Sequence, residues 1–237
     1  MRVCIAIPVF NEEKRLRNAV VKLHPFLTRR LQVDWEIVIA DNGSNDRTLA
    51  IAESLSQEFP GVRVVYLNEN GRGGALKRIW SESDADILSY MDVDLSSDLE
   101  SFPSLIEALT TGGYDVAVGS RLLNPGLTTR CFKREFVSRC YNLLVRSILG
   151  THFSDAQCGF KALTRRAAQH LLPLVEGMGW FFDTELLVMA EKSGYRIFDL
   201  PVRWVENCDS RVKIFRTSIV DLKELLRLRR KLRRSKT

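Results

Sequence analysis

The chain has 237 residues, of which 45% are hydrophobic and 27% are charged, a composition that suits one large globular domain with a substantial core. No apolar run reaches the roughly 18 residues of a membrane-spanning helix. The five cysteines are scattered without a CxxC pair, which argues against disulfides or a zinc site and favours a reduced, cytoplasmic compartment. The opening apolar residues run into Asn11-Glu12-Glu13 without a cleavage pattern, so we expect a first strand rather than a signal peptide.

The net charge of +6 is concentrated near the C-terminus. From Leu222 onward, the chain carries eight basic residues against Glu224 alone, so the remainder is close to neutral. We therefore expect a single domain over residues 1–215, followed by a basic tail over residues 216–237. A neutral body argues against nucleic acid as a partner, because such binding needs a broad basic face.

Short β-branched runs alternate with helical patterns along the first half. We expect strands at 3–9, 35–40, 62–67, 87–91 and 115–119, and helices at 12–31, 48–59, 75–83 and 102–110. This alternation predicts an α/β fold with a mostly parallel sheet covered by helices. In the less regular second half, we expect helices at 134–149, 164–171 and 182–193, and a strand at 195–205 in which Pro201 favours an edge position.

Asp92 and Asp94 follow the apolar run at 87–91. Two carboxylates this close repel each other unless a cation lies between them. Mg²⁺ or Mn²⁺, bound through carboxylates and phosphate oxygens, is a natural occupant. The pair therefore indicates a metal-dependent enzyme that acts on a phosphorylated substrate, and the alternative is a solvated turn at the end of a strand.

Five motifs occur in a characteristic order, four of them directly after expected strands and one before an expected helix. They are Ile7-Pro8-Val9-Phe10-Asn11-Glu12-Glu13, residues 37–48, Asn70-Gly71-Arg72-Gly73-Gly74-Ala75, Met91-Asp92-Val93-Asp94-Leu95 and Val118-Gly119-Ser120-Arg121. Together they resemble the family 2 glycosyltransferases, which have a GT-A fold. Residues 154–161 and 180–186 are similar to the branch that glycosylates polyprenyl or dolichyl phosphate, closest to the dolichyl-phosphate β-glucosyltransferases, with the mannosyltransferases as near relatives.

The resemblance implies a nucleotide-sugar donor site in the first half of the chain. It assigns donor nucleotide contacts to Pro8, Phe10, Glu12, Asp41, Asp92 and Val93. It also implies that Asp92 and Asp94 hold Mg²⁺ or Mn²⁺ on the diphosphate. From the residues alone, Asp41 is also compatible with a turn or helix cap, and Phe10 with simple packing at the end of a strand.

The resemblance further implies a lipid monophosphate acceptor, bound by Arg121, Arg134, Ser138 and Arg211, with Asp94 and Arg121 as the catalytic residues. A phosphate monoester is largely dianionic at neutral pH, so it is a nucleophile that needs little help from a general base. In-line attack inverts the anomeric centre. The roles of Asp155, Asp183 and Glu185 stay open between contacts to sugar or acceptor and a place in the first turn of a helix.

The basic tail combines an apolar stripe, formed by Ile219, Leu222, Leu225 and Leu226, with basic residues on its other faces. Such a helix suits an anionic membrane surface. We therefore expect a hexosyltransferase held peripherally at the cytoplasmic face of a membrane, with or without a membrane subunit. UDP-glucose and GDP-mannose both remain open as donors. The alternatives are a family 2 transferase with a non-lipid acceptor, and a basic binding module for membrane or nucleic acid with a non-catalytic core.

Overall fold

The computed structural model describes residues 1–68, 71–124, 126, 128–129, 132–205 and 214–234. A seven-stranded sheet forms its centre, in the order β3-β2-β1-β4-β7-β5-β8. Its strands are β1 (Arg2–Val9), β2 (Asp34–Asn42), β3 (Val62–Leu67), β4 (Ile87–Met91), β5 (Val116–Ser120), β7 (Phe160–Thr164) and β8 (Ile197–Pro201). Only β7 runs antiparallel to its neighbours among these strands. The expected α/β fold with a mostly parallel sheet is therefore confirmed.

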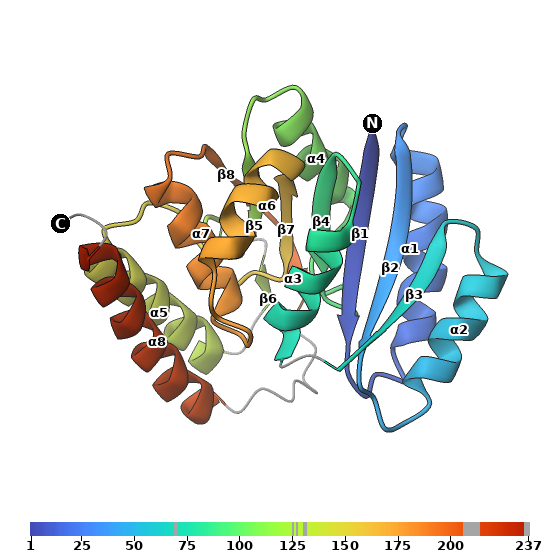
Figure 1. Ribbon diagram of the computed structural model, residues 1–237, viewed down its shortest axis with the longest axis horizontal. Coiled ribbons are helices and arrows are strands. Elements are labelled where there is room, and N and C mark those ends of the chain that lie inside the picture. Colours follow the sequence, from blue (N-terminus) through green and yellow to red (C-terminus); the bar gives the residue numbers. More distant parts are fainter. Residues whose placement is uncertain (69–70, 125, 127, 130–131, 206–213, 235–237) are drawn as a thin grey trace.

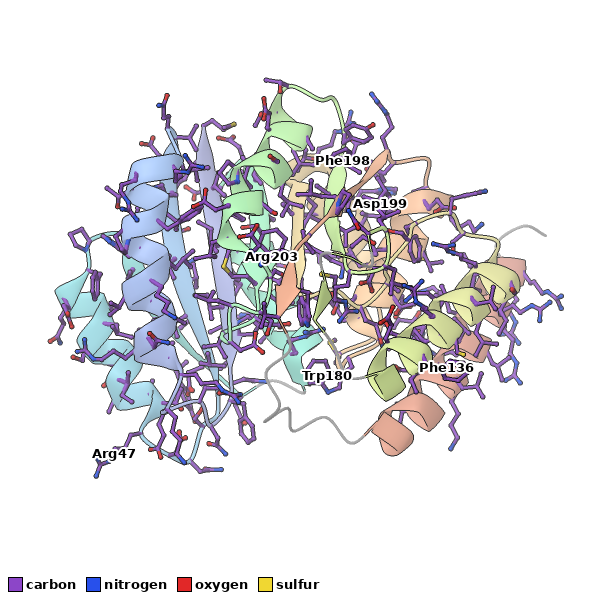
Figure 2. The ribbon with its side chains drawn as sticks, turned by 180° about the vertical axis from the view of Figure 1, so that it is seen from behind. Arg47, Phe136, Trp180, Phe198, Asp199 and Arg203 are labelled. Atoms are coloured by element: carbon purple, nitrogen blue, oxygen red, sulfur yellow. The ribbon has the colours of Figure 1, made fainter. Side chains whose placement is uncertain are left out.

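Helices cover both faces of this sheet. Figure 1 shows α3 (Gly71–Glu82), α6 (Arg165–Leu171) and α7 (Phe182–Lys192) on the near face. Figure 2, seen from behind, shows α1 (Leu16–Arg30) and α4 (Phe102–Thr110) in front of the sheet, and α2 (Thr48–Glu58) packs beside α1. Because both faces are covered, the central strands are near-continuous apolar runs, as in β1, where residues 3–7 are all buried.

The second half departs from expectation at two places. The short segment Phe160-Lys161-Ala162-Leu163-Thr164 is strand β7, which the sequence pattern missed because a strand between two distant partners is defined by pairing rather than by periodicity. The expected strand at 195–205 divides after Pro201 into β8 and β9 (Trp204–Val205), and β9 pairs with β6 (Thr128–Thr129) in a separate two-stranded sheet. Pro201 ends β8, which is an edge strand as expected.

The basic tail is largely a helix, α8 (Ile214–Arg234), which lies alongside α5 (Phe132–Leu149) at one end of the molecule (Figure 1). Leu225 and Leu228 of α8 are buried, whereas Leu222 and Leu226 are exposed. The helix is therefore docked on the body, and only part of its apolar stripe faces outward. Ile219 lies outside the described side chains.

Candidate active site

The carboxyl ends of β1, β2, β4 and β5 lie at one edge of the sheet, since these strands all run in the same direction. The loops that follow them contain most of the donor-site residues expected from the sequence. Ligands of open α/β sheets bind at this edge. The fold thus brings together motifs that are spread over more than 100 positions of the chain.

The loops after β1 and β2 are joined by hydrogen bonds. The backbone N–H of Asn11 donates to Ser44 Oγ at 2.9 Å, and that of Glu12 donates to Thr48 Oγ1 at 2.7 Å. Asp41 is fully buried, and its Oδ1 has no hydrogen-bond partner among the described residues. Its Oδ2 accepts a hydrogen bond from the N–H of Ser44 at 3.3 Å, as in a turn. Oδ1 remains available for a ligand or water, so the donor contact of Asp41 stays a prediction.

The other expected nucleotide contacts differ in exposure. Phe10 is 53% exposed, so simple core packing does not account for it. Pro8 and Glu12 are half-buried beside it. Val93 belongs to the hydrophobic core, which leaves only its backbone for a donor contact. The four assignments stay predictions, since no contact in the structure tests them.

Asp92 and Asp94 begin the loop after β4, and both are half-buried. A tight turn holds them, in which the N–H of Leu95 donates to Asp92 O at 3.0 Å and the N–H of Ser96 donates to Asp94 Oδ1 at 3.0 Å. Asp92 also lies against Gly159, where an added Cβ would come within 1.8 Å of Asp92 Oδ2. The glycine therefore makes room for this carboxylate.

Arg72, at the start of α3, reaches across to the same carboxylate. Its Nη1 donates to Asp92 Oδ1 at 3.0 Å, and its Nη2 pairs with the buried Asp183. The guanidinium lies 4.3 Å from the ring of Trp180, a cation–π contact on an exposed indole. Figure 2 shows Trp180 between the central sheet and α5. One arginine thus connects the acidic pair to α7.

Asp183 is the centre of a buried ionic network. Besides Arg72, it accepts a hydrogen bond from the hydroxyl of Tyr90 and pairs with Lys161 Nζ at 3.0 Å. Burial alone would raise the pKa of Asp183, but Arg72 and Lys161 outweigh it and lower that pKa below its ordinary value. The same Lys161 donates to the carbonyls of Ala156 and Cys158 and so holds the loop that carries Gly159.

Arg121 follows β5 and is almost completely buried. Its Nε and Nη2 donate to the two carboxylate oxygens of Asp155 at 2.6 and 2.8 Å, and its guanidinium stacks on Trp204 at 5.0 Å. Burial would raise the pKa of Asp155, but Arg121 lowers it below the usual range. Asp155, whose role the sequence left open, is therefore the partner of Arg121 here. A phosphate at Arg121 would share this arginine with Asp155.

The other acceptor residues lie on α5 or beyond β9. Ser138 is buried, with a hydroxyl that has no partner among the described residues. The side chain of Arg134 and the whole of Arg211 lie outside the described part of the structure. Their expected phosphate contacts stay predictions.

Glu185 is fully buried and tied to α8. It accepts a hydrogen bond from the N–H of Gly177 at 2.7 Å and pairs with Arg227 at 2.9 Å. Arg227 also pairs with Glu176, so this arginine is engaged with the body. Glu185 and Asp183 thus have ionic partners in this structure, which the sequence pattern did not resolve.

Sequence reasoning missed Arg72, Tyr90, Lys161 and Trp180 as members of the site. Arg72 and Lys161 lie inside the quoted motifs, and a basic residue beside glycines in such a motif was the available signal. Trp180 opens the quoted motif at 180–186, but an aromatic residue in a loop is usually a packing residue, and Tyr90 gave no signal because it lies within an apolar run.

The segment that follows β4 contains several oxygen atoms of the kind that a divalent cation binds. Asp92 and Asp94 supply carboxylates, and Ser96 and Ser97 have buried hydroxyls without partners among the described residues. This donor set suits Mg²⁺ or Mn²⁺. The described residues contain no cluster of three or more His, Cys, Asp or Glu side chains that would hold a metal alone. Substrate oxygens would therefore have to complete the coordination shell.

Comparison with known proteins adds independent evidence. The profile of the family described as "Glycosyl transferase family 2" matches residues 4–172. Glycosyltransferase AglD of Haloferax volcanii is 37% identical over 218 residues, which cover 91% of this chain and 35% of that protein. Dolichyl-phosphate beta-glucosyltransferase ALG5C of Trichomonas vaginalis is 32% identical over 220 residues, which cover 88% of this chain and 65% of that protein. The chain thus spans about a third of the length of the first relative and about two thirds of the length of the second.

The solved structures show the same fold. Glucosyl-3-phosphoglycerate synthase from Mycobacterium tuberculosis, in complex with Mn²⁺ and UDP-glucose, superposes with a TM-score of 0.68 at 21% identity. The match covers 94% of this chain and 78% of that one.

A further relative was found by sequence. The dolichyl-phosphate beta-glucosyltransferase of Saccharomyces cerevisiae is 28% identical over 95% of this chain and 73% of its own length.

Proposed function

The chain belongs to glycosyl transferase family 2, and we propose that it transfers a hexose from a nucleotide sugar to a polyprenyl or dolichyl phosphate at a membrane surface, with inversion. The observation that carries this proposal is the convergence of Asp41, Asp92 and Asp94 at the carboxyl edge of the sheet. The names of the dolichyl-phosphate beta-glucosyltransferases support the lipid acceptor and favour UDP-glucose over GDP-mannose as the donor.

The chemistry requires two anions to approach each other. The acceptor phosphate is a competent nucleophile as a dianion, so its attack on the anomeric carbon needs no general base from the chain. Asp94, with Asp92, would hold Mg²⁺ or Mn²⁺ on the donor diphosphate, and the bound cation would supply Lewis-acid stabilisation of the leaving group. Mn²⁺ in the related solved structures supports divalent-metal use.

On the acceptor side, Arg121 is proposed to orient the lipid phosphate, with Ser138 and, beyond the described side chains, Arg134 and Arg211. Arg suits this role because its planar fork binds phosphate oxygens in pairs. The bidentate Arg121–Asp155 pair fixes the direction of the guanidinium before the acceptor arrives. With an α-linked donor, attack opposite the leaving diphosphate gives a β-linked product.

The surface of α5 and α8 supports peripheral membrane docking. Exposed apolar residues gather on both helices; they are Phe136, Val137, Leu143 and Leu144 on α5, and Val220, Leu222 and Leu226 on α8. Figure 2 shows Phe136 on α5. Lys223, Arg229 and Arg230 are exposed on the same α8 helix, and no helix in the described residues is long and apolar enough to cross a bilayer. We propose that this surface rests on the cytoplasmic face of an anionic membrane.

Donor binding tests the proposed site directly. Thermal unfolding of the wild type is measured with UDP-glucose, GDP-mannose and other nucleotide sugars, with and without Mn²⁺. We expect one donor to raise the melting temperature only in the presence of metal, and Asp94→Ala to abolish the shift. Asp84→Ala, at the opposite end of β4, is the control and should keep it. A donor effect that survives both metal removal and Asp94→Ala would contradict the proposed site.

Two other functions remain as outcomes of turnover assays. Hexose transfer to a water-soluble phosphate, without activity on any lipid phosphate, would favour a family 2 transferase with a non-lipid acceptor. No turnover, combined with tight binding of RNA or anionic vesicles, would favour a non-catalytic binding module.

A further inference from the structure

Arg72 pairs with Asp92, one of the two acids after β4. We propose that Arg72 is an internal counter-ion of Asp92, which competes with the divalent cation, so that the metal binds together with the nucleoside diphosphate rather than ahead of it. This inference rests on the proposed donor site and adds an order of binding to it.

The first argument is the geometry of the guanidinium. Nη1 of Arg72 lies 3.0 Å from Asp92 Oδ1, and Nη2 pairs with Asp183. Only 11% of the Arg72 side chain is exposed, so solvent screens these charges weakly. The two ends of one guanidinium therefore bind two carboxylates, one from the loop after β4 and one from α7.

The second argument is that the segment carrying Arg72 is held in place. A Cβ on Gly71 would come within 2.7 Å of Met178 O, and one on Gly73 would come within 2.4 Å of the Phe182 side chain. The N–H of Gly74 donates to Met178 O at 3.0 Å, and Trp180 stacks on the guanidinium. Because the backbone around Arg72 packs closely against residues 178–182, we expect Arg72 to leave Asp92 by rotation of its side chain.

The third argument is that Asp92 Oδ1 is already engaged. It accepts a hydrogen bond from Nη1 of Arg72 at 3.0 Å. Asp94 Oδ1 accepts from the N–H of Ser96. A divalent cation that binds Asp92 through Oδ1 would share this oxygen with a guanidinium that is itself positive.

Electrostatics then favours joint binding of metal and diphosphate. A divalent cation beside Asp92 would be repelled by the guanidinium, because both are positive and the arginine is largely shielded from solvent. The diphosphate brings negative charge that offsets both cations. In the unloaded site Arg72 thus compensates the charge of Asp92, and the metal gains full access to Asp92 when the nucleotide arrives.

Mn²⁺ binding to the nucleotide-free protein tests this inference. Replacing Arg72 should raise the Mn²⁺ affinity if the arginine competes with the metal, and lower it if the arginine only positions Asp92. Titrations followed by electron paramagnetic resonance compare wild type, Arg72→Gln and the control Arg78→Gln, whose exposed arginine pairs only with Glu82 among the described residues. We expect Arg72→Gln to bind Mn²⁺ about tenfold more tightly than wild type. The control should leave Mn²⁺ affinity unchanged, and Asp92→Asn in the Arg72→Gln background should remove the gain.

A second comparison separates this inference from the donor site itself. UDP or GDP should strengthen Mn²⁺ binding strongly in the wild type and less in Arg72→Gln. If Arg72→Gln binds Mn²⁺ equally or more weakly, the inference is wrong while the donor site stands. If the wild type binds no Mn²⁺ with either nucleotide, both are contradicted. Arg72→Met is a second variant that removes the charge. If Arg72→Gln does not fold, a Mn²⁺ affinity in Arg72→Met no higher than that of the wild type would overturn the competition.

Discussion

Two acids of the site, Asp92 after β4 and Asp183 on α7, are held by residues from distant segments. Asp92 lies against Gly159 and pairs with Arg72, and Asp183 pairs with Lys161 and accepts a hydrogen bond from Tyr90. Buried charges of this kind are costly unless they are paired and hydrogen-bonded. The site is therefore preorganised by ion pairs between segments that come together only in the folded protein.

Gly159→Ala should disable the donor site without unfolding the protein. The added Cβ would overlap Asp92 Oδ2, so the carboxylate must turn away from its present position. We expect metal-dependent donor binding to weaken at least about tenfold, which corresponds to about 1.4 kcal/mol. Calorimetric titration with Mn²⁺ and UDP-glucose measures this loss. Gly179→Ala is the matched control, since its Cβ would meet nothing within 4 Å among the described atoms; equal losses in both variants would count against the assigned role of Gly159.

Residue types and spacing predicted the acids at this site, but not their partners. The acids Asp41, Asp92 and Asp94 lie at or after the ends of apolar runs. Parallel strands all end at the same edge of the sheet, so their terminal residues come together there. The pairing of Arg121 with Asp155, or of Arg72 with Asp183, joins positions more than 30 residues apart. Such pairs depend on side-chain directions in the folded core, on which local periodicity carries no information.

Among the secondary-structure elements, α8 has a second connection to the site. Its Asp221 accepts a hydrogen bond from Gln157 Nε2 at 2.8 Å, and Gln157 lies two residues from Gly159. The helix is thus linked both to the loop beneath Asp92 and, through Arg227, to Glu185. The sequence predicted this helix from its apolar stripe, but its docking partners came from tertiary packing.

Asp221→Asn should stabilise the protein at neutral pH. Burial raises the pKa of Asp221 to about 6 in spite of the hydrogen bond from Gln157. The folded state therefore holds this proton more tightly than the unfolded chain, so the wild type loses stability as pH rises from about 4 to about 6. The variant escapes this loss and should gain about 1–3 kcal/mol in unfolding free energy at pH 7, and little below pH 4.

Urea denaturation between pH 4 and pH 8 measures the difference. Asp34→Asn, an exposed position at the start of β2, is the control and should follow the wild-type profile. A pH profile of Asp221→Asn parallel to that of the wild type would show that Asp221 does not carry this penalty.

At the scale of the whole molecule, the donor site and the α5–α8 surface belong to one fold with uneven charge. The chain before Leu222 is nearly neutral, and the excess of positive charge lies on α8 and the residues after it. Exposed apolar side chains lie on the same helix. Composition predicted this asymmetry. It did not show that Arg227 and Lys231 are engaged with Glu176, which reduces the positive charge available to a membrane.

Replacing Lys223, Arg229 and Arg230 by Gln should weaken binding to anionic vesicles. At about 1 kcal/mol per basic residue near such a surface, the three changes together should lower affinity by roughly two orders of magnitude. Sedimentation with phosphatidylserine vesicles measures this. The charge-matched control replaces Lys22, Arg29 and Arg78, which are exposed on α1 and α3. Equal losses in both variants would point to net charge rather than to this surface.

The central claim is hexose transfer to a lipid phosphate, and product analysis tests it most directly. Purified protein is incubated with UDP-glucose, Mn²⁺ and dolichyl phosphate in detergent, with GDP-mannose in a parallel reaction, and the lipid is examined by mass spectrometry. The account predicts a lipid phosphate heavier by one hexose in the wild type, no such product with Asp94→Ala, and an unchanged yield with Asp84→Ala. Turnover of the donor without any glycosylated lipid, or lipid product that persists in Asp94→Ala, would contradict it.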